Sequence, residues 1–367
     1  MVVHKPTCRC VGYLVRFAHL QYSMGPLFGF LYSWTTIVAL KPSSGAIIAS
    51  ILGEYATRAI LHILNGPSGG FHKYDRGDLP GFGIKTIAAL SILFICIVLS
   101  VHRSLGTRFQ LGITVAKVAL LYSIPVVAII VMAQGRMPTE SKHAFATFSG
   151  LFEGSTKSPS RYALAFYSGL WAYDGWDQCT FVAGEIRNAS VNVPRSIRLS
   201  SVLVTVSFTV TVIAYFATLP PALVAGTNSV ALDFGSNALG LVGGILFAAV
   251  VAISCLGALN GHLYTYSRLI FAAGQEGFLP SLFGAQNGYF RTPINATLLG
   301  TALILCFVVF GSGFVSLVNF CGVCAWFWYG MTVLGLLVLR VKEPNLGRPY
   351  KVRLGALCFS LTQCRPG

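Results

Sequence analysis

The stretch of residues 163–185 reads Ala163-Leu-Ala-Phe-Tyr-Ser-Gly-Leu-Trp-Ala-Tyr-Asp-Gly-Trp-Asp-Gln-Cys-Thr-Phe-Val-Ala-Gly-Glu185. It begins and ends as an apolar helix, but Asp174, Gly175 and Asp177 lie near its middle. A carboxylate at bilayer depth costs about 2.5 kcal/mol or more, so it requires a cavity or a partner. Unwound backbone at the membrane midplane is typical of transporters, because it offers N–H and C=O groups to a substrate. The stretch therefore predicts a helix broken near residues 173–175 that lines a binding cavity. The alternative is a kinked helix whose Asp side chains bond to a neighbour.

The rest of the chain has the composition of a membrane protein. Of its 367 residues, 54% are hydrophobic and 10% are charged, whereas a typical globular chain is about 25% charged. The 26 Phe and 15 Tyr exclude a disordered chain, because disordered segments are poor in apolar residues. The net charge of +15 does not indicate a nucleic-acid binder, since the basic residues separate apolar runs and do not gather on one face of a water-soluble fold. The remaining fold class is an all-α polytopic membrane protein in a lipid bilayer.

Eight apolar runs are long enough to cross about 30 Å of hydrocarbon, which takes about 20 residues in a helix. The runs cover residues 26–57, 86–102, 112–133, 162–185, 196–219, 239–266, 293–311 and 314–339. They lack the alternating strands of a transmembrane barrel. With the N-terminus inside, the inner segments hold fifteen Lys and Arg residues and the outer segments hold eight. Because Lys and Arg concentrate on the cytoplasmic side, we expect a cytoplasmic N-terminus.

Three motifs follow one another around the interrupted helix: Phe166-Tyr-Ser-Gly-Leu-Trp-Ala-Tyr-Asp-Gly-Trp-Asp177, Gly184-Glu-Ile-Arg-Asn188 and Asn192-Val-Pro-Arg195. Together they resemble the sixth helix and the following loop of the L-type amino acid transporters, a family of the amino acid–polyamine–organocation superfamily. Four further stretches resemble the third, fifth, eighth and tenth helices of that family. They contain Gly25-Pro-Leu27, Ala116-Lys117, Ser254-Cys-Leu-Gly257 and Val318-Asn-Phe320. The likeness covers roughly residues 24–353.

The resemblance implies a LeuT-like inverted-repeat fold that is incomplete, with about eight spanning helices, the third to the tenth of the family's twelve. It implies three parts of the chain. Residues 1–23 form an atypical N-terminal segment, residues 24–339 the transmembrane transporter domain, and residues 340–367 a cytoplasmic loop with the start of a further helix. We therefore expect a chain that is truncated at both ends.

The resemblance also gives roles to single residues. Trp171 falls where the family has an aromatic that closes over the bound amino acid, and the backbone of residues 172–175 would meet the substrate ammonium. Lys117 matches a lysine that stands in for the sodium ion of sodium-coupled relatives; the alternative is a lysine that snorkels to the headgroups. Asn260 has two explanations, substrate contact and tight helix packing. The implied substrate-binding residues are Trp171, Ala172, Tyr173, Asp174, Gly175, Asp177 and Asn260.

Two expectations about these residues come from physical chemistry. Because a cation in lipid is costly, we expect Lys117 to lie in the protein interior beside the helix at 239–266. Two unneutralised carboxylates, Asp174 and Asp177, would favour a second positive charge on the substrate. We therefore expect both neutral and cationic amino acids as substrates. If mutual repulsion keeps one of the two carboxylates protonated, large neutral substrates are preferred instead.

The predicted function is sodium-independent amino acid transport, by a permease or an exchanger that works by alternating access at the plasma membrane. We expect no enzymatic activity, no cofactor and no metal, because the seven His residues are scattered along the chain. Animal members of the resembled family have a cysteine in the outer loop at 59–85 for the disulfide to a heavy chain. This chain has no Cys there, so we expect no disulfide-linked heavy chain. Three alternatives remain: an inactive remnant or partial gene model of such a transporter, a non-transporting membrane scaffold or sensor, and a membrane enzyme.

Overall fold

The structure is a computed structural model that describes residues 15–65, 81–101, 105–147, 149–152, 154–181, 183, 186–227, 229–286, 292–311 and 314–344. These residues form helices joined by turns, and no strand occurs among them, as the composition predicts. The longer helices are α1 (Val15–Met24), α2 (Pro26–Thr35), α3 (Lys41–Asn65), α4 (Gly81–Val101), α5 (Leu105–Ala133), α7 (Pro159–Leu170), α9 (Ala189–Thr218), α11 (Val230–Gln275), α12 (Ile294–Phe310) and α13 (Phe314–Lys342). Short helical segments connect them: η1 (Thr36–Leu40), α6 (Thr139–Ala146), η2 (Gly150–Phe152), η3 (Trp171–Tyr173), α8 (Gln178–Phe181), α10 (Pro221–Gly226) and η5 (Ser281–Gly284).

Within the described residues, six helices are long and apolar enough to cross a membrane. They span Pro26–Leu61, Gly81–Val101, Gln110–Ala133, Ala189–Thr218, Val230–Gln275 and Ser316–Lys342. α12 is a shorter apolar helix, and the expected run at 162–185 is divided among α7, η3 and α8. The eight sequence-predicted runs therefore correspond to six long helices, one short helix and one broken helix, and the chain is an integral membrane protein.

The helix from Pro26 to Leu61 contains one wide π-helical turn, η1, which ends directly before Lys41 and Pro42. In this turn the Lys41 N–H donates to the carbonyl of Thr36, five residues earlier. With the same spacing, the next bond would run from the N–H of residue 42 to the carbonyl of Ile37. Residue 42 is a proline without an N–H, so this bond cannot form. The Tyr266 hydroxyl on α11 donates to the Ile37 oxygen at 2.5 Å instead. The proline thus interrupts the helix without leaving its backbone unsatisfied.

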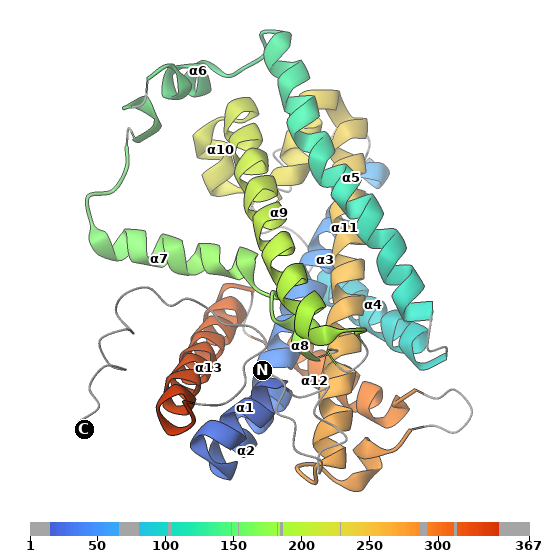
Figure 1. The fold of residues 1–367 in the computed structure, drawn as a ribbon. Helices are drawn as coiled ribbons and strands as arrows, with labels where there is room; N and C mark the ends of the chain where they lie inside the picture. The colour runs from blue at the N-terminus through green and yellow to red at the C-terminus, as the bar shows by residue number, and fades with distance from the viewer. Residues whose placement is uncertain are drawn as a thin grey trace, which may run out of the picture.

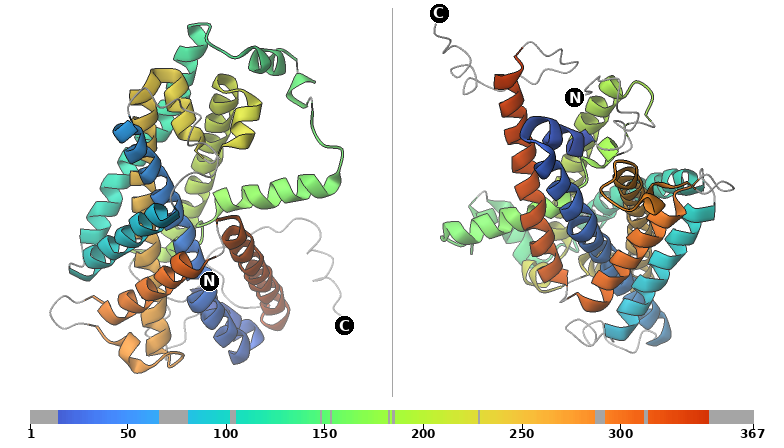
Figure 2. Two further views of the ribbon diagram at one scale, coloured as in Figure 1. Left: turned by 180° about the vertical axis from the view of Figure 1, so that it is seen from behind. Right: turned by 90° about the horizontal axis from the view of Figure 1, so that it is seen from below.

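α3 lies in the centre of the packed helices, in contact with α4, α11, α12 and α13 (Figure 1). Figure 2 shows the same arrangement from behind and from below, with α12 beside α3. A Cβ added to Gly53 of α3 would come within 2.4 Å of the Ile84 carbonyl oxygen on α4, so this glycine permits the close approach of the two helices. The core around α3 contains Ile47, Ile92 and Ile304, all fully buried.

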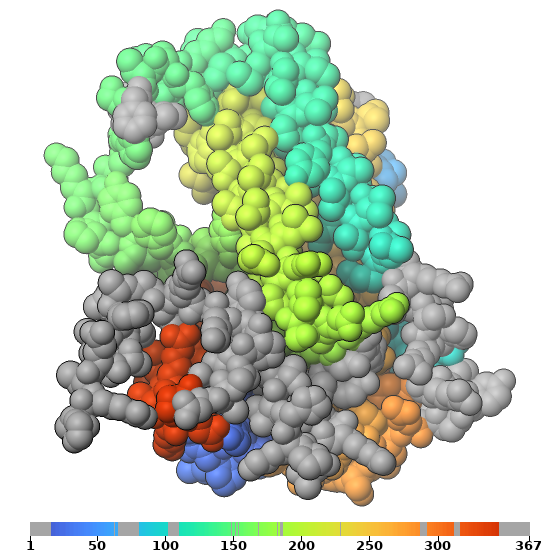
Figure 3. Space-filling model, viewed as in Figure 1, coloured from blue at the N-terminus to red at the C-terminus, as the bar shows by residue number. Residues whose placement is uncertain are grey.

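α7 lies across the direction of the long helices and projects away from them, as Figures 1 and 2 show. In the space-filling view, the segment from α6 to α7 stands apart from α9 and leaves an open gap on that face (Figure 3). The C-terminal end of α7 returns to the centre of the molecule, where the candidate site lies.

Candidate functional site

The predicted break in the helix is confirmed. α7 ends at Leu170, one turn of 3-10 helix follows, and the backbone of Asp174 is extended with φ −69° and ψ 160°. Gly175 has φ +92°, a conformation that residues with a side chain rarely adopt. The chain re-enters a helix at Gln178. The extended Asp174 and the positive-φ Gly175 therefore separate the helix that ends at Tyr173 from the helix that begins at Gln178.

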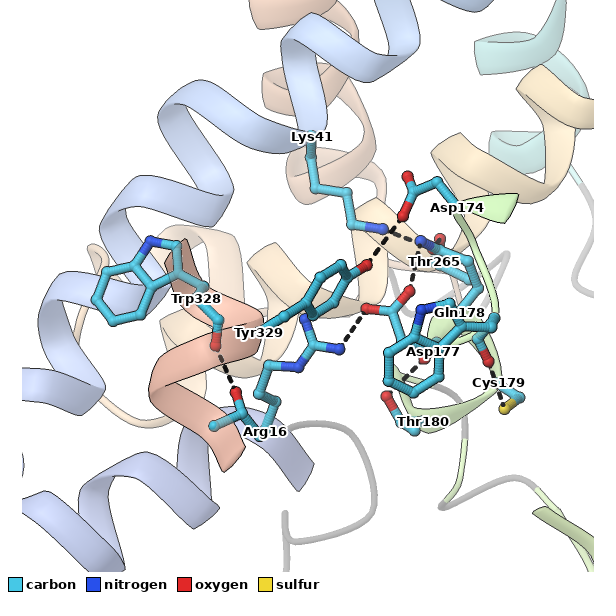
Figure 4. A network of polar contacts seen from close by, with 12 residues as sticks. Arg16, Lys41, Asp174, Asp177, Gln178, Cys179, Thr180, Thr265, Trp328 and Tyr329 are labelled. Atoms are coloured by element: carbon cyan, nitrogen blue, oxygen red, sulfur yellow. Dashed lines mark hydrogen bonds and ion pairs between the residues drawn. The ribbon is translucent and has the colours of Figure 1, made fainter. Parts of the chain in front are cut away.

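Asp177 is buried, with 4% of its surface exposed, and carries a direct ion pair. Its Oδ2 lies 2.8 Å from Nη2 of Arg16 on α1 (Figure 4). The Arg16 guanidinium carbon lies 4.6 Å from the ring centroid of Tyr329 and 5.9 Å from those of Tyr32 and Trp176. A carboxylate and three aromatic rings thus surround one guanidinium.

Asp174 has a different set of neighbours. Its Oδ1 accepts a hydrogen bond of 2.9 Å from the hydroxyl of Tyr329 on α13. Lys41, with 5% of its surface exposed, donates to Oε1 of Gln178 at 2.6 Å. The same Oε1 accepts a hydrogen bond of 2.9 Å from the Thr265 hydroxyl. Figure 4 shows these groups converging from α3, α11, α13 and the broken helix.

This network corrects the expectation of two unneutralised carboxylates. Asp177 is paired with the Arg16 cation, and Asp174 accepts from a tyrosine hydroxyl. Nor do the two residues share one helical face, because the backbone between them forms a turn. The sequence predicts that a substrate cation pairs with these carboxylates. For Asp177 the protein itself supplies the cation, which is Arg16 on α1.

Three cavities meet at the break, and Asp174 lines all of them. The largest, about 450 Å³, lies between the break and helices α5 and α9. A second of about 120 Å³ lies between the break and α13, and a third of about 50 Å³ lies beside Arg16 and Lys41. Unwound backbone beside cavities is an arrangement that can bind a small ligand.

The structure brings most of the predicted site residues together. The 450 Å³ cavity is lined by Ala172, Tyr173, Asp174, Gly175 and Lys117. The half-buried Trp171 lines the cavity of about 120 Å³ with Tyr329.

Two predicted residues are placed differently from what we expected. The side chain of Lys117 is exposed and lines the cavity, so the prediction that it lies in the protein interior is wrong. The second part of that prediction holds, because α5, which carries Lys117, packs beside α11. Asn260 is buried on α11 and donates to Oε1 of Gln110 on α5 at 2.9 Å. It lines none of the three cavities, which favours its packing explanation.

Sequence reasoning missed several residues of the network, namely Arg16, Lys41, Gln178, Thr265 and Tyr329. Lys41 is a charged residue inside an apolar run, and the same signal in the sequence indicates that Asp174 and Asp177 are functional. Arg16 lies in the segment 1–23, to which the resemblance gives no helix of the family. Tyr329 is one of 15 tyrosines and carries no signal of its own. Of the motif at 184–188, Gly184 and Glu185 lie outside the described residues, as does most of the outer loop at 59–85.

Comparison with known proteins agrees with this geometry. The family model described as amino acid permease matches residues 17–363. The b(0,+)-type amino acid transporter 1 of Mus musculus is 34% identical over 92% of this chain and 65% of its own length. The cystine/glutamate transporter of Homo sapiens is 29% identical over 92% and 63% of the two chains. The large neutral amino acids transporter small subunit 2 of Mus musculus is 32% identical over 92% and 60%. The chain thus spans less than two thirds of the length of these relatives. With its broken helix and a family match over most of its length, the chain belongs to the amino acid permease family.

Proposed function

We propose that the protein moves amino acids across a membrane by alternating access and that the substrate binds at residues 171–175. The observation that carries this proposal is the helix break beside the 450 Å³ cavity. Pockets for small ligands commonly have about 300–1,000 Å³, so the cavity has the size for one amino acid. The substrate's ammonium and carboxylate need hydrogen-bond partners away from water, and the backbone of an unwound segment supplies both donors and acceptors.

The proposal includes independence from sodium. Lys117 lines the same cavity as Asp174 and Gly175. Its ammonium group, which is part of the protein, can supply there the positive charge that a bound sodium ion would otherwise bring. A permease and an exchanger are both compatible with this site. The names of the relatives support amino acids as the substrate class, since they are transporters of amino acids, of large neutral amino acids, and of cystine and glutamate.

The site favours neutral amino acids, because Asp177 already has a cation beside it. Asp174 remains as the carboxylate through which a cationic amino acid would be accepted. Placement in the plasma membrane with a cytoplasmic N-terminus, and the absence of a disulfide-linked heavy chain, belong to the same proposal. Their support is the distribution of Lys and Arg and the lack of Cys at 59–85.

Uptake of labelled leucine into vesicles that contain the purified chain tests the proposal. We expect uptake above that of protein-free vesicles, at equal rates in sodium and choline buffers, and faster uptake into vesicles preloaded with leucine if the protein is an exchanger. Asp174→Asn should change the competition by lysine, whereas Glu140→Gln, which alters an exposed carboxylate on α6, should not. No uptake with or without preloading would overturn the proposed transport, and a requirement for sodium would overturn its sodium independence.

A further inference from the structure

We propose that Arg16 is a specificity-determining residue, whose guanidinium fills a cation subsite of the protein and keeps substrate cations out of it. The subsite is the space between the Asp177 carboxylate and the rings of Tyr32, Trp176 and Tyr329. Its ligand class is an organic cation on a flexible stem, such as a guanidinium or an alkylammonium group. The statement about substrates rests on the proposed function, but the cation subsite itself does not.

The geometry of the subsite is that of a cation site. The faces of aromatic rings attract a cation within about 6 Å of their centroids. All three rings meet this distance, at 4.6 Å for Tyr329 and 5.9 Å for Tyr32 and Trp176. Asp177 adds a charge-assisted bond of 2.8 Å. Planar, weakly hydrated guanidinium groups suit this combination of rings and carboxylate better than a compact ammonium does.

The subsite adjoins the proposed substrate position. Trp176 forms one wall of the subsite and also lines the 450 Å³ cavity. Asp174 lines that cavity as well as the 50 Å³ cavity beside Arg16. A substrate bound along the break can therefore extend its side chain toward Arg16. An arginine or lysine substrate would meet a cation already in place.

The charged residues that line the 50 Å³ cavity are balanced. Asp174 and Asp177 contribute two negative charges, and Arg16 and Lys41 contribute two positive charges within the same cluster. Removing Arg16 leaves the cluster one negative charge in excess and empties the space between the rings. Both changes favour a cationic ligand.

Contacts other than the ion pair hold α1 in place. Nε2 of His19 donates to the Thr332 carbonyl oxygen on α13 at 3.0 Å, and the Tyr22 hydroxyl donates to Glu343. The ring of Phe17 packs on Phe278 with 4.8 Å between the centroids. A variant without the Arg16 guanidinium therefore keeps three anchors of α1.

The test is chemical rescue of Arg16→Ala, with methylguanidinium as the probe and thermal unfolding of the purified chain as the readout. A ligand that binds only the folded state raises the unfolding temperature. We expect methylguanidinium chloride to raise the unfolding temperature of Arg16→Ala relative to sodium chloride at equal concentration. It should not do so for the wild-type chain, for Arg195→Ala, which alters an exposed arginine on α9, or for the double variant Arg16→Ala/Asp177→Asn.

Transport gives the second readout. In vesicles, arginine should inhibit leucine uptake by Arg16→Ala at least about tenfold more strongly than uptake by the wild-type chain, which corresponds to about 1.4 kcal/mol of binding free energy. Equal unfolding temperatures of Arg16→Ala in the two salts, or an equal rescue of the double variant, would overturn the proposal. If Arg16→Ala does not fold, the wild-type chain still decides: stabilisation by methylguanidinium would mean that the subsite is open. If no variant takes up leucine while the rescue succeeds, the proposed function fails and the cation subsite stands.

Discussion

The hydroxyl of Tyr329 donates a hydrogen bond of 2.9 Å to Oδ1 of Asp174 and thereby joins α13 to the break in the helix. Tyr329→Phe removes this bond and leaves its ring beside Arg16 in place. Bonds to charged acceptors contribute about 1.5–3 kcal/mol, so we expect a loss of free energy of unfolding toward the lower end of that range. Unfolding in mixed micelles measures the change. Tyr162→Phe on α7, where the tyrosine is 45% exposed, is the control. A Tyr329→Phe chain as stable as this control would contradict the assignment.

Gly175 is the residue that the break needs, because its φ is +92°. Gly175→Ala forces a side chain into this conformation at a cost of about 1–3 kcal/mol. We expect lower stability and the loss of leucine uptake. Gly169→Ala is a matched control, since Gly169 is helical and no atom lies within 4 Å of an added Cβ. This second variant should be neutral or slightly stabilising, because alanine is the better helix former. Similar behaviour of the two variants would mean that the break does not depend on the glycine.

Tyr266 and Pro42 should be energetically coupled. Tyr266→Phe deprives the buried Ile37 carbonyl of its donor, which costs about 1–3 kcal/mol. Pro42→Ala restores an N–H to the backbone beside the wide turn. We therefore expect Tyr266→Phe to cost less in the Pro42→Ala background than in the wild-type chain. A double-mutant cycle measures this difference. Strictly additive effects would show that the tyrosine and the proline act independently.

His19 should make the docking of α1 sensitive to acid. Burial lowers the pKa of His19 below its ordinary value of 6.5, because the charged form is disfavoured away from water. The unfolded chain then takes up the proton more readily, so stability is present above about pH 6.5 and is lost as the pH falls. We expect the unfolding temperature to drop more between about pH 7.5 and pH 5.5 for the wild-type chain than for His19→Gln. An equal drop in both chains would assign the acid sensitivity to other groups.

The broken helix was predictable from sequence because two Asp residues and a glycine in an apolar run conflict with a continuous membrane helix. The same logic located residues 172–175 beside a cavity. It could not give the partner of Asp177, because Arg16 lies 161 positions earlier in the chain and pairing over such a distance depends on tertiary packing.

Lys117 shows a second limit. The cost of a cation in lipid predicts that its ammonium avoids hydrocarbon, and burial in the protein is one way to do so. A cavity is another, and the exposed side chain lines one. Burial in the protein and exposure to a cavity both keep the Lys117 ammonium out of hydrocarbon. The spacing of residues along α5 does not tell which of the two placements occurs.

The wide turn before Pro42 also sets an order of events during synthesis. The Ile37 carbonyl receives its hydrogen bond from Tyr266, 229 positions later in the chain. An unsatisfied carbonyl in hydrocarbon is costly, so the segment around Ile37 is incomplete while the ribosome is still translating the region between them. The helix from Pro26 to Leu61 thus reaches its final form only after α11 has emerged.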